Sequence, residues 1–222
     1  MLRNALILTI VLLFIFIILS PSADTSATLI RLTNTSEQSL SLHPQLSDDG
    51  RVVVFESTAD LANIGGTNSF HMIRASISGV TPGYEDVARS RATSISVSGN
   101  GDRIVFASNE DLLGENSDRN SEIYLKDGSK LNQLTHTDAD TESARLTEGN
   151  LEPSISNDGR WITFVSNRNL SSPSLQELVL IDTTTGSISQ LTNSTSISPQ
   201  HPKINADGTR IFRQRAVAKY LE

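Results

Sequence analysis

Apolar and polar residues alternate in short runs along most of this chain. From Thr28 onward, apolar residues recur at every second position within each run, and Gly, Asp, Asn and Ser separate the runs. A spacing of two places side chains on the same face of a β-strand. Ser and Thr are abundant, whereas stretches rich in Ala, Leu, Glu and Lys are few. The pattern therefore predicts an all-β protein made of short strands.

Four segments of the chain resemble one another around an Asp-Gly or Asn-Gly pair. Such a pair is typical of a tight hairpin turn, because Gly tolerates a positive φ without steric cost. The four turn glycines are Gly50, Gly101, Gly159 and Gly208, separated by 51, 58 and 49 residues. The segments are SDDGRVVVF from Ser47, SGNGDRIVF from Ser98, SNDGRWITF from Ser156 and NADGTRIFR from Asn205.

Two apolar columns follow the turn in this repeat. Because their spacing is two residues, both columns lie on one face of a strand, and we expect that face to point into a core. The fourth unit departs from the pattern, since Arg213 falls in the second column. The first column contains Val53, Ile104, Ile162 and Ile211, and the second contains Phe55, Phe106 and Phe164.

Each complete unit contains further strand-like segments. We expect a third strand at Phe70–Arg74, Glu122–Asp127 and Glu177–Asp182, and a last strand that ends in Leu-Thr at residues 134–135 and 191–192. A unit of four short strands that recurs about every 50 residues is typical of a propeller blade. The units are centred near residues 44–74, 95–135, 153–192 and 202–213, which gives three complete four-stranded blades and a partial fourth.

The repeat resembles a known family at this point. Pro153–Ser166 reads PSISNDGRWITFVS and, with the strand ending in Asp and the later QLT, is similar to the TolB-type β-propeller repeat. The resemblance extends from Thr28 to Phe212. It implies a TolB-like propeller related to six-bladed propellers. Blades of this type occur in periplasmic scaffold proteins, in the propeller that gates prolyl-oligopeptidase-like peptidases and in other exported proteins, so the resemblance does not fix a function.

The sequence leaves the closure of the ring open. Closed propellers have four to eight blades, and closure removes exposed sheet edges. Three interpretations remain: a truncated chain, a small four-bladed ring with an irregular last blade, and an open array completed by a partner or a second copy. Leu29–Thr33 could supply the last strand of the final blade.

The N-terminal segment predicts export. Arg3 precedes an apolar run at Ala5–Leu19, and Ser20-Pro21-Ser22 supplies small residues for a signal peptidase. The uncharged residues 4–23 are also long enough to cross a bilayer as an uncleaved anchor. We therefore expect a signal peptide or membrane anchor at residues 1–23 and propeller repeats at 24–222. The repeats would then be periplasmic or extracellular, and membrane contact would occur only through the N-terminal segment.

Composition removes several classes of function. The chain has no Cys, which excludes disulfides, thiol catalysis and zinc–thiolate sites. Its net charge of −7 and the lack of a basic cluster argue against nucleic-acid binding. The nearest basic candidate is Arg210–Arg215, which we interpret as a strand end with solvated charges. We find no G-x-S-x-G, H-E-x-x-H, P-loop or dinucleotide motif, and so expect no enzyme activity and no catalytic residue.

One loop carries oxygen ligands at a spacing that could suit a hard cation. The candidate ligands for calcium are Glu115, Asp118, Asn120 and Glu122. The alternative is a polar turn between the second and third strands, and we expect no other cofactor. His43 and His201 occupy the same repeat position before Pro, which indicates a packing or turn role.

The sequence therefore predicts an exported, non-catalytic β-propeller scaffold that binds another exported or cell-envelope protein. One alternative is the propeller part of a prolyl-oligopeptidase-like peptidase, whose catalytic groups lie in a separate α/β domain. Another is a propeller that binds a glycan or small ligand at its central channel. That alternative predicts aromatic residues at the channel mouth, whereas we expect Trp161, the single Trp, to pack in or near a core.

Overall fold

A computed structural model describes residues 29, 31–35, 38–65, 69–77, 79, 81–92, 94–138, 149–167, 175–196 and 198–215. The chain divides into a unit of residues 1–31 and a unit of residues 32–222, and the fold below belongs to the second. Within the described ranges the chain forms strands and turns, and none of it is a helix able to span a membrane. The expected signal or anchor at residues 1–23 lies outside these ranges.

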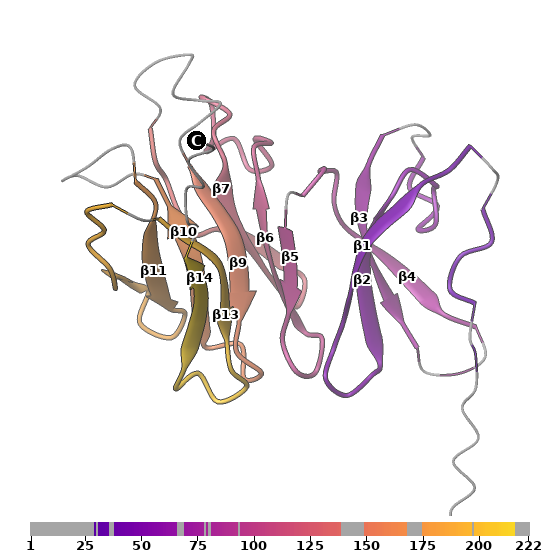
Figure 1. The fold of residues 1–222 in the computed structure, drawn as a ribbon. Coiled ribbons are helices and arrows are strands. Elements are labelled where there is room, and N and C mark those ends of the chain that lie inside the picture. Colours follow the sequence, from indigo (N-terminus) through magenta and orange to yellow (C-terminus); the bar gives the residue numbers. More distant parts are fainter. Residues whose placement is uncertain are drawn as a thin grey trace, which may run out of the picture. The chain divides into compact units, whose positions relative to one another are not determined.

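The strands form four antiparallel sheets in chain order, which we number as blades one to four (Figure 1). Blade one contains β1 (Ser41–Leu46), β2 (Val52–Ser57), β3 (His71–Ser76) and β4 (Gly83–Ala88). Blade two contains β5 (Ser94–Val97), β6 (Arg103–Ser108), β7 (Glu122–Asp127) and β8 (Lys130–Gln133). Blade three contains β9 (Asn150–Ile155), β10 (Trp161–Ser166), β11 (Glu177–Asp182) and β12 (Ser187–Gln190). Blade four contains β13 (Pro199–Ile204) and β14 (Ile211–Arg215). Three complete blades and a partial fourth are confirmed.

The first turn of every blade is the same structure, as the repeat predicts. The turn glycines have φ of 70°, 74°, 73° and 72° in chain order. In blade one the amide of Gly50 donates to the Ser47 carbonyl at 2.9 Å, and the amide of Ser47 donates to the Val52 carbonyl at 2.9 Å. The same pair of bonds recurs at the other three turns. Gly suits this position because a side chain raises the energy of a left-handed backbone.

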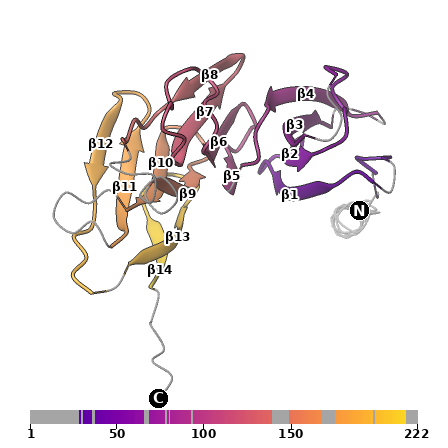
Figure 2. The same cartoon turned by 90° about the horizontal axis from the view of Figure 1, so that it is seen from above.

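The cores lie between successive blades, which follow one another in chain order in Figure 2. The predicted apolar columns face the preceding blade, and the alternate positions of the same strand face the next one. Blade one contributes Val52 and Val54 to the first core, where they meet Ile104 and Phe106 of blade two. The core between blades two and three repeats this arrangement with Val105, Ala107, Ile123 and Leu125 against Ile155, Ile162, Phe164, Val179 and Ile181.

The turns also join the blades to one another. The Asp49 amide donates to the Gly99 carbonyl, the Gly99 amide to the Asn157 carbonyl, and the Asn157 amide to the Ala206 carbonyl, at 2.9–3.1 Å. A Cβ built on Gly101 would lie 2.5 Å from Val52 of the preceding blade. The turn glycines of blades three and four contact Arg103 and Trp161 in the same way. Glycine therefore serves both the turn and the close approach of neighbouring blades.

Some element boundaries differ from the prediction. β3 begins at His71 rather than Phe70, and β8 and β12 end one residue before the Leu-Thr pairs. The expected closing strand at Leu29–Thr33 is wrong for its described residues, which form no strand. Leu32 instead packs on blade one, where its carbonyl accepts a hydrogen bond from the Tyr84 hydroxyl. Apolar character alone did not distinguish a strand from an extended segment that lies on a blade.

Candidate functional site

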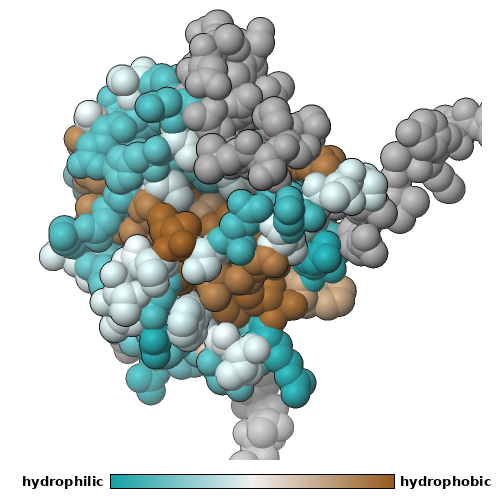
Figure 3. Space-filling model, turned by 90° about the vertical axis from the view of Figure 1, so that its left-hand side faces the viewer, coloured by the Kyte–Doolittle hydropathy of each residue, from teal (hydrophilic) through white to brown (hydrophobic). Residues whose placement is uncertain are grey.

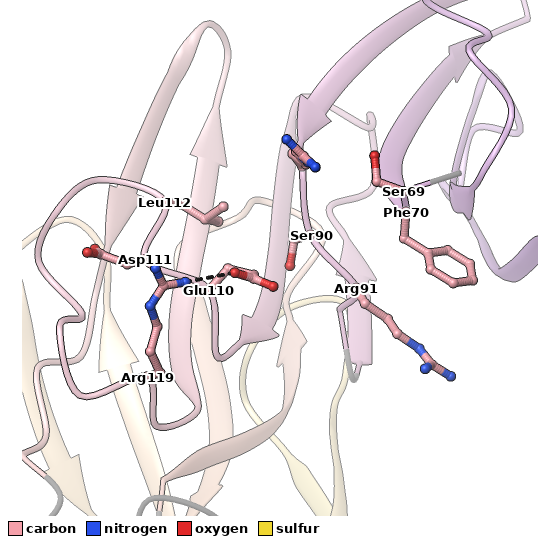
Figure 4. A pocket seen from close by; sticks show the side chains of 9 residues that line it. Ser69, Phe70, Ser90, Arg91, Glu110, Asp111, Leu112 and Arg119 are labelled. Atoms are coloured by element: carbon pink, nitrogen blue, oxygen red, sulfur yellow. Dashed lines mark hydrogen bonds and ion pairs between the residues drawn. The ribbon is translucent and has the colours of Figure 1, made fainter. Parts of the chain in front are cut away.

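A pocket of about 520 Å³ lies where blades one and two meet, at the end of the blades that carries the β2–β3, β4–β5 and β6–β7 connections. Because the strands of a blade run antiparallel, these connections all lie at the end opposite the Asp-Gly turns. Figure 4 shows the side chains that come together from the three connections. The pocket is lined by Ser69, Phe70, Arg89, Ser90, Arg91, Glu110, Asp111, Leu112 and Arg119.

The pocket carries three arginines and two carboxylates, although the chain as a whole is acidic. Arg119 pairs with Glu110 at 2.9 Å, and both side chains are about half exposed. The guanidinium of Arg91 lies 5.3 Å from the ring centre of Phe70, a cation–π contact. Arg89 and Arg91 are exposed, and no carboxylate among the described residues forms an ion pair with either. These two guanidinium groups can therefore accept a ligand carboxylate or phosphate.

The β6–β7 connection is held in place by buried polar groups. Asn116 is buried, and its side chain donates to the Asn120 carbonyl at 3.0 Å. The Tyr124 hydroxyl donates to the Glu110 carbonyl at 2.8 Å. Burial raises the pKa of Tyr124 to about 12, which favours the protonated phenol that donates this hydrogen bond. The wall of the pocket that carries Glu110 is thus positioned by the core of blade two.

The four candidate calcium ligands interact with other groups of the protein, and Asn120 and Glu122 share Thr137 as a partner. Glu115 is half exposed and pairs with His136 at 2.9 Å. Asn120 is fully buried, and its amide donates to Thr137. Glu122 is 1% exposed and accepts hydrogen bonds from protein donors at both carboxylate oxygens. Asp118 also has a polar partner. Across the described ranges no group of three or more His, Asp or Glu side chains is placed to share a metal ion, and the calcium site stays a prediction.

Glu122 and Glu177 have a role that the sequence interpretation missed. Each is buried at the start of the third strand, and each accepts a hydrogen bond from the Thr that follows the fourth strand, Thr135 or Thr192. Backbone amides two residues further on also donate to them, at 2.6 Å in both blades. The two carboxylates therefore clasp the outer strand of their blade. The recurrence of Glu and of Leu-Thr at fixed repeat positions was the available signal.

Blade one has a different arrangement at the same repeat position. His71 replaces the Glu, and its Nδ1 lies 3.0 Å from Oδ1 of Asp86 on β4, while its Nε2 lies 3.3 Å from the Ser69 hydroxyl. His71 is 7% exposed, and Ser69 lines the pocket. The order Ser, His, Asp is that of a hydrolytic triad. The equivalent positions in blades two and three hold structural clasps, which indicates that His71 and Asp86 clasp β3 to β4.

The other two repeat-related histidines occupy bulges. His43 and His201 have φ of 52° and 48°, and the pairing of β1 with β2 and of β13 with β14 shifts beside them. His43 contacts the buried Glu56 at 2.7 Å, and His201 contacts Glu152 at 2.8 Å. Each of the two His-Pro pairs thus marks a bulge within the first strand of its blade.

Trp161 packs as expected. It is half buried at the start of β10, with the Arg160 guanidinium 4.5 Å from its ring centre on one side. A Cβ on Gly208 would lie 2.2 Å from its Cδ1, so the ring rests on the turn of blade four. The residue therefore belongs to the contact between blades three and four.

Comparison with known proteins supports the fold through structure alone. No family model and no curated protein matches the chain. TolB from Acinetobacter baumannii is similar with a TM-score of 0.54 and 19% identity, over 81% of this chain and 38% of that one. Porphyromonas gingivalis dipeptidyl peptidase 4 is similar with a TM-score of 0.54 and 12% identity, over 82% of this chain and 23% of that one. The chain thus spans well under half the length of either protein. It has the TolB-like β-propeller fold.

Proposed function

We propose that this chain is an exported, non-catalytic β-propeller module that binds another exported or cell-envelope protein. The pocket between blades one and two is its recognition site. The observation that carries the proposal is the composition of this pocket, whose lining comes from connections between strands and includes Arg89 and Arg91 without carboxylate partners among the described residues. Connections on a rigid scaffold are where propellers and similar folds place their binding residues.

The chemistry of the pocket favours a partner that presents a carboxylate. Two exposed guanidinium groups on one connection can hold a carboxylate by paired hydrogen bonds, and Phe70 beside Arg91 offers an apolar surface. Asp111 is held within its own connection, where its Oδ1 accepts a hydrogen bond from the backbone amide of Asn116 at 3.0 Å. A side-chain carboxylate or a C-terminus of an exported protein fits this arrangement. The export itself rests on the N-terminal pattern and on the resemblance of the repeat.

Site-specific photo-cross-linking in intact cells tests the proposal. A benzoylphenylalanine at position 70 replaces one aromatic residue by another, and the same group at position 130 reports on the opposite end of the blades. We expect one defined protein adduct at position 70, little at position 130, and loss of the adduct when Arg89 and Arg91 are both replaced by Glu. Equal labelling at both positions, or labelling that does not depend on the arginines, contradicts the proposal.

The non-catalytic part of the proposal is tested at Ser69. Among the described residues, Ser69, His71 and Asp86 form an arrangement that could act as nucleophile and base. Since the repeat assigns His71 to a clasp, we expect no covalent adduct when the purified chain is treated with a fluorophosphonate. A stoichiometric adduct on Ser69 that disappears in Ser69→Ala would show instead that the chain is a serine hydrolase.

The alternative role as the propeller part of a prolyl-oligopeptidase-like peptidase keeps one supporting observation. The fold similarity to Porphyromonas gingivalis dipeptidyl peptidase 4 covers 82% of this chain. In such a protein the pocket would restrict access of peptides to a separate catalytic domain. An adjoining coding sequence with a G-x-S-x-G motif supports this role, and further Asp-Gly repeats support the binding module.

A further inference from the structure

The contacts between blades one and two and between blades two and three follow one rule. The residue four positions after the turn glycine points toward the next blade, and the two apolar columns point toward the preceding one. Val54 packs on Ile104 and Phe106, and Val105 packs on Ile162 and Phe164. The rule makes the surface of one blade complementary to the opposite surface of the blade that follows it.

Blade four carries an unpaired copy of the surface that faces forward. Phe212 stands four positions after Gly208 and therefore corresponds to Val54 and Val105. It is 73% exposed, whereas both of those valines are fully buried. Lys203 pairs with Phe212 in the register of β13 and β14, and Gln214 follows on the same face. We call Lys203, Phe212 and Gln214 the forward face. Figure 3 views the side on which blades three and four lie and shows patches of apolar surface there.

Blade one carries the opposite surface. Its columns, Val53 and Phe55, correspond to the residues on which Val54 and Val105 pack. They are 8% and 4% exposed because side chains of the same chain, Leu32 among them, pack against them, and a groove of about 160 Å³ remains beside them. Leu32, Thr33, Ser41, Leu42 and Pro44 complete the groove. We call this groove the rear face. Its lining is mainly apolar, as the environment of an inserted aromatic ring requires.

The turns of blades one and four each lack one of the contacts that join neighbouring turns elsewhere in the chain. A Cβ built on Gly50 meets no atom within 4 Å, whereas each other turn glycine lies against a side chain of the preceding blade. Arg103 supplies that side chain for Gly159 and donates to its carbonyl at 3.1 Å. Arg210 holds the corresponding position in blade four and is exposed. The row of turn-to-turn hydrogen bonds also stops at Ala206, as far as the described residues show.

Charge agrees with this pairing. Asp49 is exposed in the turn of blade one next to the open Gly50, and Arg210 and Lys203 are exposed at the forward face. Opposite charges at the two surfaces favour their association and set its orientation. The apolar groove, the open glycine and the acidic turn of blade one thus match the phenylalanine, the arginine and the basic charge of blade four.

We infer that the forward face of one copy of this chain docks on the rear face of a second copy. Phe212 enters the groove beside Val53 and Phe55, and Arg210 lies over Gly50 and donates to its carbonyl, as Arg103 does at Gly159. The contact is heterologous, since different surfaces of the two copies meet. It resembles the interface that joins successive blades within a chain, except that Leu32 and Thr33 form part of the groove that receives Phe212.

Cysteine cross-linking of the full-length chain tests this contact, because the natural sequence has no Cys. Two differently tagged copies are expressed together, one with Ser41→Cys at the rear face and the other with Gln214→Cys at the forward face. Both residues are exposed, and Phe212 stays in place. A short bis-maleimide is then added to intact cells. A third copy with Lys130→Cys, at the start of β8, is the matched control.

We expect a cross-linked pair between the Ser41→Cys and Gln214→Cys copies, no pair between two Ser41→Cys copies, and no pair with the Lys130→Cys copy. Adding Phe212→Asp to the Gln214→Cys copy should reduce the product at least about tenfold, the loss that about 1.4 kcal/mol of association energy gives. Absence of the mixed product, or its persistence in Phe212→Asp, overturns the inference. Cross-linking only within one chain, when a single copy carries both cysteines, overturns it as well and shows that the two ends close on each other.

Discussion

Blades two and four are built from the same repeat but have opposite environments. Blade two has a neighbour on each face, and Phe106 and Val105 on its second strand are both fully buried. Blade four has blade three on one side, and Phe212 on its second strand is 73% exposed. The local structure is the same, with a turn glycine at φ 74° in one blade and 72° in the other. The comparison shows that the repeat fixes the turn and the direction of each side chain, whereas burial depends on the neighbouring blade.

The largest expected effect is a difference in the free energy of unfolding between substitutions of Phe106 in blade two and Phe212 in blade four. Phe106→Ala empties a fully buried site that also stacks on Tyr124, with ring centres 5.5 Å apart. It should lower the free energy of unfolding by about 3–5 kcal/mol. Phe212→Ala should change it by less than about 0.5 kcal/mol in dilute protein, because the side chain is exposed.

Urea denaturation followed through the fluorescence of Trp161 measures both values, since the chain has a single Trp. An equal loss of stability in the two variants would contradict the burial assigned to the two phenylalanines.

The second prediction concerns the clasps. Glu122→Ala leaves the donors of Thr135, Thr137 and Asn150 without their acceptor in a buried site. We expect a loss of about 2–3 kcal/mol. Glu115→Ala on the same connection is the control and should cost less than about 1 kcal/mol, because its ion pair with His136 is exposed. Thermal unfolding measures the melting temperatures of the two variants. If they are similar, the hydrogen bonds of Glu122 do not contribute the expected stability.

The third prediction compares two turn glycines. Alanine at either position must adopt a left-handed backbone, which costs about 1–2 kcal/mol. At Gly101 the new Cβ also lies 2.5 Å from Val52, so overpacking should add about 1–3 kcal/mol, whereas Gly50 has open space. Chemical denaturation should therefore show a clearly larger loss for Gly101→Ala. Equal losses would mean that blades one and two do not approach as closely as described.

The smallest expected effect is a dependence on acid. The hydrogen bond from Arg160 holds the pKa of Asp182 well below its usual 3.8, and Ser156 lowers the pKa of Asp158 in the turn of the same blade. Because the folded pKa values are depressed, these groups stabilise the fold fully above about pH 3.8 and lose that contribution as the pH falls below it. Asp182→Asn should flatten the fall in melting temperature between about pH 4 and pH 2. An unchanged slope would contradict the assigned bond.

Much of the fold could be predicted from the sequence because the repeat displays its physical causes. Gly50 and its equivalents indicate a turn that needs a positive φ, and the apolar columns that contain Val53 and Phe55 indicate one face of a strand. Contacts between distant connections left no such pattern. The pocket arises where Phe70, Arg91 and Glu110 meet from three separate connections, and no spacing in the sequence links them.

The clasps lie between these extremes. Glu122 and Thr135 recur in blade three as Glu177 and Thr192, but each reads as an ordinary polar strand end until the two strands are paired. The expected closing strand at Leu29–Thr33 failed for a related reason. Its Leu-Thr ending matches blades two and three, yet Leu32 packs on blade one by its apolar side chain rather than by strand pairing.

The most direct measurement is the mass of the full-length chain in detergent, by light scattering with the detergent contribution subtracted, for the natural chain and for Phe212→Asp. The account predicts that the natural chain has a multiple of the single-chain mass of 24.1 kDa and that the variant has that mass alone. A natural chain of 24.1 kDa at all concentrations, or an assembly that Phe212→Asp leaves intact, would contradict the docking of blade four on blade one of a second copy.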